Sequence, residues 1–233
     1  MSSFWPRLLK IKVCLLLGTS CLIYSSKLRA ESSYLPSYKK LIKLAPDLSS
    51  NVALLATSAA ECAVTKSGLA RPEKIAIIDY SLPSTQKRFW LFDLEDQSLL
   101  LRDFVAHGKN SGEKMAQSFS NSLGSLQSSL GLFQVGDSYI GKHGNSLRLI
   151  GLEPGVNDLA LERAIVIHGA DYVSKDYIRE HNRLGRSFGC PALAPDSAEK
   201  VIEHFEDGNG LLFSYYPDRN WLKQSNFLNG CSL

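Results

Sequence analysis

The sequence predicts a single, mainly β domain of the α+β class. About seven short runs of β-branched, aromatic or leucine residues are separated by turn residues, a pattern typical of strands joined by hairpins or a meander. There is no internal repeat and no alternating strand–helix pattern, which argues against a doubly wound sheet. The 233 residues, 44% of them hydrophobic, are enough for one domain with a sizeable core.

Residues 1–30 have the pattern of a secretory signal peptide. Basic residues precede an apolar run over 13–24, and residues 28–30 resemble a cleavage site. The run of about twelve apolar residues is too short to span a bilayer comfortably. We therefore expect export to the periplasm or cell envelope and no stable membrane span after cleavage. An uncleaved anchor and a lipoprotein modified at Cys21 are the alternatives.

The positive net charge of the chain comes from this N-terminal segment. It holds five of the 26 Lys and Arg residues and none of the 23 Asp and Glu residues. Its removal leaves 21 basic and 23 acidic side chains, a formal charge of −2 in place of +3. Nucleic-acid binding needs a basic face on the folded domain, so the composition gives no support to a nucleic-acid partner.

Three of the five cysteines lie outside the signal segment. They are Cys62, Cys190 and Cys231, in a compartment that is expected to be oxidising. One hypothesis is a bridge between Cys62 and Cys231 with Cys190 free; the other is three reduced thiols, since spacing cannot show proximity. No pair of cysteines and no His/Cys cluster has zinc-ligand spacing, so no metal site is predicted.

After residue 30 the sequence predicts a polar lead-in followed by a helix. Apolar residues recur at steps of three and four over 47–66, which places them on one helical face. Asp47 or Ser49 can cap the start of this helix, and Gly68 can end it. Residues 31–70 are therefore expected to form a lead-in and a helix that packs on the domain.

The remaining elements follow from the change to a strand-like period. A serine-rich segment over 110–131 and a glycine-punctuated segment over 137–145, which contains Tyr139 and His143, are expected as loops. The predicted strands are 74–80, 88–94, 98–106, 131–136, 147–151, 164–168 and 211–216.

Two helices are expected after the strand at 164–168. A short helix fits 171–182. A second fits 196–206, where Asp196 and Glu199 have the spacing of an N-capping pair.

A cysteine and a histidine in this region have the character of a nucleophile and its base. His168 closes an apolar strand, and Cys190 lies between Gly189 and Pro191. An imidazolium beside a thiol lowers its pKa, and the same imidazole can later protonate a leaving amine. The carbonyl of Gly169 is the nearest group that could orient the ring. The N–H groups of Gly189 and Cys190 are candidate oxyanion donors. The alternative is an inert buried thiol and a strand-end histidine with a structural hydrogen bond.

Several blocks of the sequence resemble the L,D-transpeptidases of bacterial cell walls, in particular the exported proteins with a murein L,D-transpeptidase catalytic domain. The family signature is His-Gly, a gap, and then Ser-His-Gly-Cys. The similar blocks are DYSLPSTQKRFWLFDL (79–94), VAHGKNSG (105–112), FSNSLGSLQSSLG (119–131), YIGKHGNSLRLIGLEPGVND (139–158), IVIHGADYVS (165–174) and GRSFGCPAL (185–193). They cover most of the chain from about residue 74 to 217.

The resemblance implies a β-rich catalytic domain over 71–220, with a helix before it, a helix after the catalytic cysteine and a C-terminal tail over 221–233. It implies that peptidoglycan stem peptides are the partners. Cys190 would attack the amide after the third residue of a tetrapeptide stem, at an L-configured diaminopimelate centre. D-Ala would leave, and the acyl-enzyme thioester would pass to an amine acceptor. No metal or organic cofactor is expected.

The resemblance also assigns individual roles. His168 corresponds to the general base and Gly169 to the residue whose carbonyl orients it. Ser187, Gly189 and Cys190 correspond to the rest of the signature.

One signature position differs, since Phe188 takes the place of the histidine between Ser and Gly. Phe188, Tyr139 and His143 are candidate substrate-binding residues. Arg186 is a further candidate for a substrate carboxylate, and a structural ion pair is its alternative.

Two other functions share these residues. Water in place of an amine would resolve the thioester and give an L,D-carboxypeptidase or an amidase. A non-catalytic peptidoglycan-binding domain could keep the site as a vestige. Sequence features do not separate an amine from water as the second nucleophile.

Overall fold

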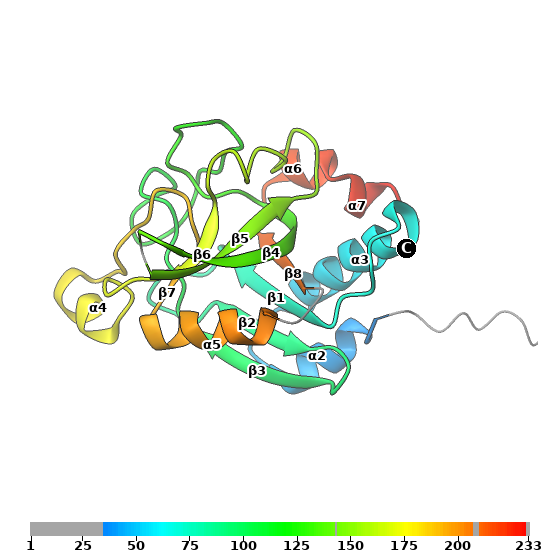
Figure 1. Cartoon of the computed structure of the whole chain (residues 1–233), viewed down its shortest axis with the longest axis horizontal. Helices are drawn as coiled ribbons and strands as arrows, with labels where there is room; N and C mark the ends of the chain where they lie inside the picture. The colour runs from blue at the N-terminus through cyan, green and yellow to red at the C-terminus, as the bar shows by residue number, and fades with distance from the viewer. Residues whose placement is uncertain (1–34, 143, 207–209, 232–233) are drawn as a thin grey trace, which may run out of the picture. The chain divides into compact units, whose positions relative to one another are not determined.

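A computed structural model describes residues 35–142, 144–206 and 210–231, all of which belong to one compact unit (Figure 1). The expected signal peptide at 1–30 and the candidate residue His143 lie outside the described residues. Within the described residues, no helix has the length and apolar character that a membrane crossing requires.

The centre of the fold is one eight-stranded mixed sheet with the strand order β3-β2-β1-β8-β4-β5-β6-β7. The β1/β8 and β6/β7 pairs are parallel, and the other neighbouring pairs are antiparallel. The β-rich α+β class predicted from the sequence is confirmed. The strands are β1 Lys74–Asp79, β2 Phe89–Asp93, β3 Ser98–Asp103, β4 Gly131–Gly141, β5 Gly144–Gly151, β6 Val166–Gly169, β7 Ala192–Leu193 and β8 Gly210–Tyr215.

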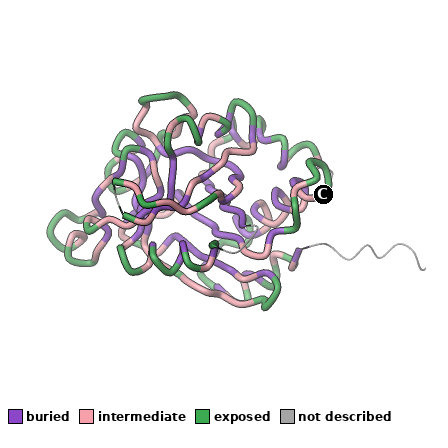
Figure 2. The backbone as a smooth tube through the Cα atoms, in the orientation of Figure 1, coloured by how far each residue is buried: buried purple, intermediate pink, exposed green. Residues whose placement is uncertain are grey.

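Helices pack on this sheet and complete its core. The long helix α3 contacts β1, β4 and β8, and α5 contacts β3, β5, β6 and β7 (Figure 1). Strands β1, β2 and β8 are buried along almost their whole length, as the purple tube in Figure 2 shows. The helices are α2 Tyr38–Leu44, α3 Ser50–Ser67, α4 Lys175–His181, α5 Pro195–Phe205, α6 Arg219–Gln224 and α7 Asn226–Asn229.

The two edges of the sheet approach each other, because the chain after β3 returns to pair beside β7. Ala106 forms an antiparallel bridge with Ala192, and its N–H donates to the Ala192 carbonyl at 2.8 Å. Gly108 forms a parallel bridge with Ser187. The segment after β3 therefore lies against the segment that carries Cys190.

Three expectations about local structure are wrong. The lead-in contains helix α2, whose apolar residues Tyr38, Leu41, Ile42 and Leu44 pack against the core. The glycine-punctuated segment forms the ends of β4 and β5, where Tyr139 pairs with Ser146 in an antiparallel hairpin. Asp196 does not cap α5. Ala194 precedes the helix and Pro195 occupies its first turn, so the carboxylate lies inside the first turn, where it interacts favourably with the helix dipole.

Other predicted boundaries agree with the structure. Gly68 ends α3 in the left-handed conformation at φ 64°, which glycine adopts without strain. By contrast, the C-terminal tail expected over 221–233 contains most of α6 and all of α7, and α7 packs on α3. The described N- and C-terminal parts thereby share one core with the sheet.

A disulfide joins α3 to the end of the described chain. Cys62 and Cys231 are bonded with a Cα–Cα distance of 5.8 Å and a sequence separation of 169, and of the three cysteines in the described residues Cys190 is the free one. Of the two hypotheses for the cysteines, the bridged one is confirmed. The bond closes a loop that contains the whole sheet.

Reduction of this disulfide is expected to lower the free energy of unfolding by about 2–5 kcal/mol, because the bond restricts a long loop of the unfolded chain. The measurement is thermal or denaturant unfolding with and without reductant. The Cys62→Ser/Cys231→Ser double variant is the control, since reductant should leave its midpoint unchanged. Equal midpoints for the wild type in both conditions would contradict the prediction.

Candidate active site

Strands β6 and β7 bring the two predicted catalytic residues to one place. His168 lies on β6 and pairs with Ala192 of β7 in parallel register. Cys190 lies two residues before Ala192, in the turn that leads into β7. The 21 residues between them leave the sheet and return to it at an adjacent position, so a strand end and a returning segment form one site.

The thiol of Cys190 lies at the edge of β6. Its Sγ–H donates to the carbonyl of Ala164 at 3.6 Å, and the N–H of Val166 also faces the sulfur. Burial raises the pKa of Cys190, and the Val166 N–H, the charge of Arg163 and the cysteine's own N–H oppose this rise. The net effect of these surroundings favours the protonated thiol. Cys190 is a thiol at neutral pH, and a base must remove its proton.

The ring of His168 is buried and has a fixed orientation. Its Nδ1 lies 2.9 Å from the carbonyl oxygen of Gly169. A carbonyl oxygen can only accept a hydrogen bond, so Nδ1 carries the proton. The lone pair of the neutral imidazole is then on Nε2. This is the tautomer that a base needs, and the orienting contact comes from the residue that the sequence indicated.

Ser187 shapes the turn that presents the cysteine. Its Oγ donates to the Cys190 carbonyl at 2.6 Å and accepts from the Gly189 N–H at 3.1 Å. The Gly189 N–H, a predicted oxyanion donor, thus has an acceptor within the turn. Of the two predicted donors, the N–H of Cys190 is the one that does not bond to Ser187.

Gly189 is required by its conformation and by its neighbours. Its φ is 130°, and a Cβ at this position would lie 2.9 Å from the Gln127 carbonyl oxygen. Its own carbonyl accepts from Ser128 Oγ at 3.2 Å. The turn that holds Cys190 is thus packed directly against the serine-rich segment.

The segment after β3 fixes the other side of this turn. The Ser187 N–H donates to the His107 carbonyl at 3.0 Å, and the Lys109 N–H donates to the Ser187 carbonyl at 2.8 Å. The Gly108 N–H donates to Ser128 Oγ at 3.0 Å. Ser128 therefore connects Gly108 to the backbone beside the nucleophile through a single hydroxyl group.

His107 has a structural role beside the site. Its Nδ1 lies 2.7 Å from Nη2 of the buried Arg88, which can only donate, so Nδ1 accepts. Burial and then the charge of Arg88 lower the pKa of His107 to about 3, and the ring stays neutral at physiological pH. The pair supports the backbone to which Ser187 is bound.

Of the predicted substrate-binding residues, Arg186 is occupied by contacts within the protein and Phe188 is exposed. Arg186 is held by Glu113 at 2.7 Å and by the carbonyl oxygens of Lys109 and Gly112, both at 3.2 Å. Of the two predictions for Arg186, the structural ion pair is therefore the one that the structure shows, and its guanidinium is already occupied by Glu113 and not open to a substrate carboxylate. Phe188 is 68% exposed, with the Lys109 ammonium 4.7 Å from its ring centroid. It forms an open aromatic surface next to the cysteine.

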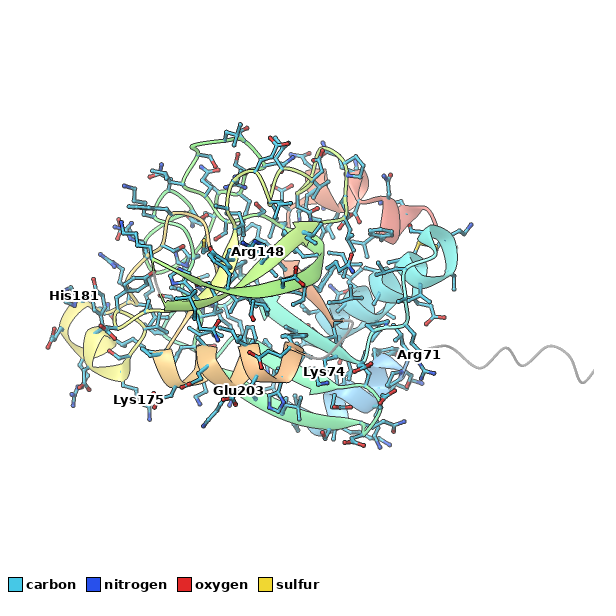
Figure 3. All side chains as sticks on the ribbon, in the orientation of Figure 1. Arg71, Lys74, Arg148, Lys175, His181 and Glu203 are labelled. Carbon is cyan, nitrogen blue, oxygen red and sulfur yellow. A yellow bond between two sulfur atoms is a disulfide. The ribbon has the colours of Figure 1, made fainter. Side chains whose placement is uncertain are left out.

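Tyr139 lies on the same face of the sheet as His168. Tyr139 pairs with Ser146 and Ser146 pairs with His168, and directly paired residues direct their side chains to one face. Arg148 pairs with Val166 and shares this face (Figure 3). Its guanidinium stacks on the Tyr139 ring at 4.1 Å. Among the described residues, Arg148 has no carboxylate partner.

Sequence reasoning missed two cations near the site, Arg148 and Arg163. The alternation of β5 could have placed Arg148 on the face of His168, had the segment before it been recognised as a hairpin. Arg163 lies just before β6 and contacts the serine-rich segment through four hydrogen bonds. No local pattern marks those contacts. The described residues contain no group of His, Cys, Asp and Glu side chains that could hold a metal ion.

Comparisons with solved structures find low-identity similarities. The helical cell shape determining protein Pgp2 from Campylobacter jejuni aligns at 17% identity and a TM-score of 0.41, over 63% of this chain and about half (48%) of its own. An L,D-transpeptidase from Mycobacterium smegmatis aligns at 12% identity and a TM-score of 0.39, over 62% of this chain and 59% of its own. An L,D-transpeptidase from Xylanimonas cellulosilytica aligns at 13% identity and a TM-score of 0.35, over 76% of this chain and 90% of its own.

Sequence comparison decides the family. No curated protein matches the sequence. A family model described as the L,D-transpeptidase catalytic domain matches residues 45–215, which include the sheet, α3, α4, α5 and the turn that carries Cys190. This match covers well over half of the chain, and the protein therefore belongs to the L,D-transpeptidase catalytic domain family.

Proposed function

We propose that this protein is a cysteine-dependent murein L,D-transpeptidase that cross-links peptidoglycan stem peptides. The observation that carries the proposal is the tautomer of His168. The Gly169 carbonyl holds the proton on Nδ1, which makes Nε2 the basic nitrogen on the strand that borders the Cys190 thiol. A thiol that burial keeps protonated needs such a base.

The acylation step follows from these groups. His168 takes the Cys190 proton as the sulfur attacks the carbonyl carbon of the third stem residue. The Cys190 N–H is a donor for the oxygen that becomes negative. The C–N bond to D-Ala then breaks, and the imidazolium returns the proton to the leaving amine. A thioester between Cys190 and the stem peptide remains.

The second half of the cycle uses the same groups in reverse. An amine of another stem peptide attacks the thioester, and His168 takes a proton from the attacking nitrogen. The C–S bond breaks, the sulfur leaves as a thiolate and recovers the proton, and the new amide is the cross-link. The exposed ring of Phe188 lies beside this position. We assign it to the acceptor side of the site.

Purified disaccharide-tetrapeptide, incubated with the protein and analysed by mass spectrometry, tests the proposal. A dimer with the mass of two substrates minus one D-Ala supports transpeptidation. A tripeptide product without a dimer would make the protein an L,D-carboxypeptidase. No product and no adduct on Cys190 would favour a peptidoglycan-binding domain without catalysis.

We also propose that the protein acts outside the cytoplasm, in the periplasm or cell envelope. The pattern of residues 1–30 supports export. The Cys62–Cys231 disulfide supports it independently, because such bonds persist in oxidising compartments. Fractionation of cells that express the full chain, with the N-terminal mass of the recovered protein, tests export and cleavage together.

Arg148 is expected to bind a carboxylate of the donor stem peptide. It is a cation without a carboxylate partner among the described residues, on the face that carries His168, and the Tyr139 ring holds its guanidinium flat. Since a charge-assisted hydrogen bond contributes about 1.5–3 kcal/mol, Arg148→Ala should raise KM for the tetrapeptide about 10- to 100-fold and change kcat little. Steady-state kinetics measure both constants.

Arg179→Ala is the matched control for Arg148→Ala, because it removes the same charge from the exposed face of α4. A tetrapeptide with amidated carboxylates should lose less affinity in the Arg148 variant than the free acid does. Equal KM increases for both peptides would contradict the carboxylate contact.

A further inference from the structure

Arg163 lies beside the nucleophile, and the steps above do not use it. The residue after it, Ala164, provides the carbonyl that Cys190 Sγ contacts at 3.6 Å. Arg163 Nη2 also lies 3.4 Å from the position that a Cβ on Gly189 would take. The guanidinium therefore borders the Gly189–Cys190 backbone, at the point where β6 begins.

Four hydrogen bonds fix the guanidinium in this place. Nη1 donates to the Ser120 carbonyl and to Ser129 Oγ, both at 2.5 Å. Nη2 donates to the Gln127 carbonyl at 2.6 Å and to Ser125 Oγ at 3.1 Å. All four acceptors are neutral and belong to the serine-rich segment. These contacts hold the cation rigidly without neutralising its charge.

The two tyrosines that interact electrostatically with the thiol, Tyr80 and Tyr172, carry no charge at pH 7. Burial raises the pKa of both Tyr80 and Tyr172 to about 12, with a further rise from Cys190, so both phenols are neutral at pH 7. His168, on the neighbouring strand, exchanges a proton during the reaction. Burial lowers the pKa of Arg163 itself, and the Cys190 thiolate opposes that change.

We propose that Arg163 is the fixed positive charge that stabilises the Cys190 thiolate, and that the serine-rich segment holds it in position. His168 moves the proton, and Arg163 stabilises the negative charge that remains on sulfur. A buried thiolate needs such a partner because it has lost most of its hydration. The importance of Arg163 for catalysis rests on the proposed function, but its effect on the thiol can be measured on the protein alone.

The test is the pH dependence of Cys190 alkylation by iodoacetamide in the oxidised protein, where the disulfide protects the other two described cysteines. Arg163→Gln should react about three- to tenfold more slowly at pH 7, because less thiolate forms. The midpoint of the rate–pH curve of Arg163→Gln should move to higher pH. Its plateau rate at high pH should be no lower than that of the wild type, since a more basic thiolate is more nucleophilic. Arg163→Lys, which keeps the charge, should stay close to the wild type.

Arg179→Gln is the control for net charge, because Arg179 is exposed on α4 and pairs only with Asp176 among the contacts of the described residues. An unchanged midpoint in Arg163→Gln would overturn the proposal. So would an equal loss of rate at all pH values, which would show a displaced turn and not a missing charge.

A second variant covers the case in which Arg163→Gln does not fold. Ser125→Ala combined with Ser129→Ala removes two acceptors of the guanidinium and keeps the charge. The alkylation midpoint of this double variant should shift to higher pH by less than that of Arg163→Gln. The absence of any shift would overturn the proposal. A midpoint shift together with no cross-linking activity in the wild type would refute the transpeptidase function and leave the role of Arg163 intact.

Discussion

Replacement of Cys190 by serine is expected to abolish formation of the covalent acyl-enzyme and to lower the cross-linking rate by about 10⁴-fold or more. Serine retains the size and the hydrogen-bonding capacity of the side chain, but its hydroxyl is far less acidic than a thiol. Burial already raises the pKa of the thiol at this position, and it would disfavour an alkoxide even more strongly. The loss should therefore be almost complete despite the small change in shape.

The measurement for Cys190→Ser is the intact mass of the protein after incubation with a carbapenem, which acylates an active thiol. The wild type should gain one adduct and the variant none. Thermal unfolding should be close to that of the wild type, because the thiol makes only weak hydrogen bonds and a hydroxyl of similar size can make them as well. Cys62→Ser is the matched control, since it should lose stability and keep the adduct. An adduct on the serine variant would show that another residue is the nucleophile.

The parts of the fold that the sequence predicted are those with a local signal. The strand ending at His168 and the turn around Cys190 are short, contiguous patterns, and the sheet places them as expected. Helix α2 is missed although Tyr38, Leu41 and Ile42 have helical spacing, because the helix has only seven residues and lies between Pro36 and Pro46. The sequence predicts the outer parts of the hairpin at Tyr139 as strands, over 131–136 and 147–151, but it predicts a loop at the tip because glycines mark it. The strand ends at the tip are defined by their pairing.

The site was predicted less completely, because its chemistry depends on contacts between distant segments. Gly189 was expected to donate to an oxyanion, but the folded turn gives its N–H to Ser187. The Cys62–Cys231 bond could not be decided, since a separation of 169 residues carries no information about distance. Arg163 was missed for the same reason. Its four acceptors span residues 120–129, and only the folded chain brings them to one guanidinium.

Removal of the base at His168 is expected to slow acylation by about 10²- to 10⁴-fold at pH 7. His168→Asn is the informative variant, because its side-chain amide can still donate to the Gly169 carbonyl while it has no group at the position of Nε2. This variant separates the orienting hydrogen bond from proton transfer. His168→Gln, which reaches the position of Nε2 with a non-basic amide, should show a similar loss.

The pH dependence of the variant gives the stricter test. Burial raises the pKa of Cys190, so below that pKa the thiolate fraction grows about tenfold for each pH unit. Without a base the reaction depends on this spontaneous ionisation, and acylation of His168→Asn should rise steeply between pH 7 and 9. The wild type should rise much less, because His168 removes the proton as the substrate reacts. Near-wild-type acylation of His168→Asn at pH 7 would show that another group is the base. A rate that stays low at pH 9 would show that His168 positions the substrate or the turn, and does not only transfer a proton.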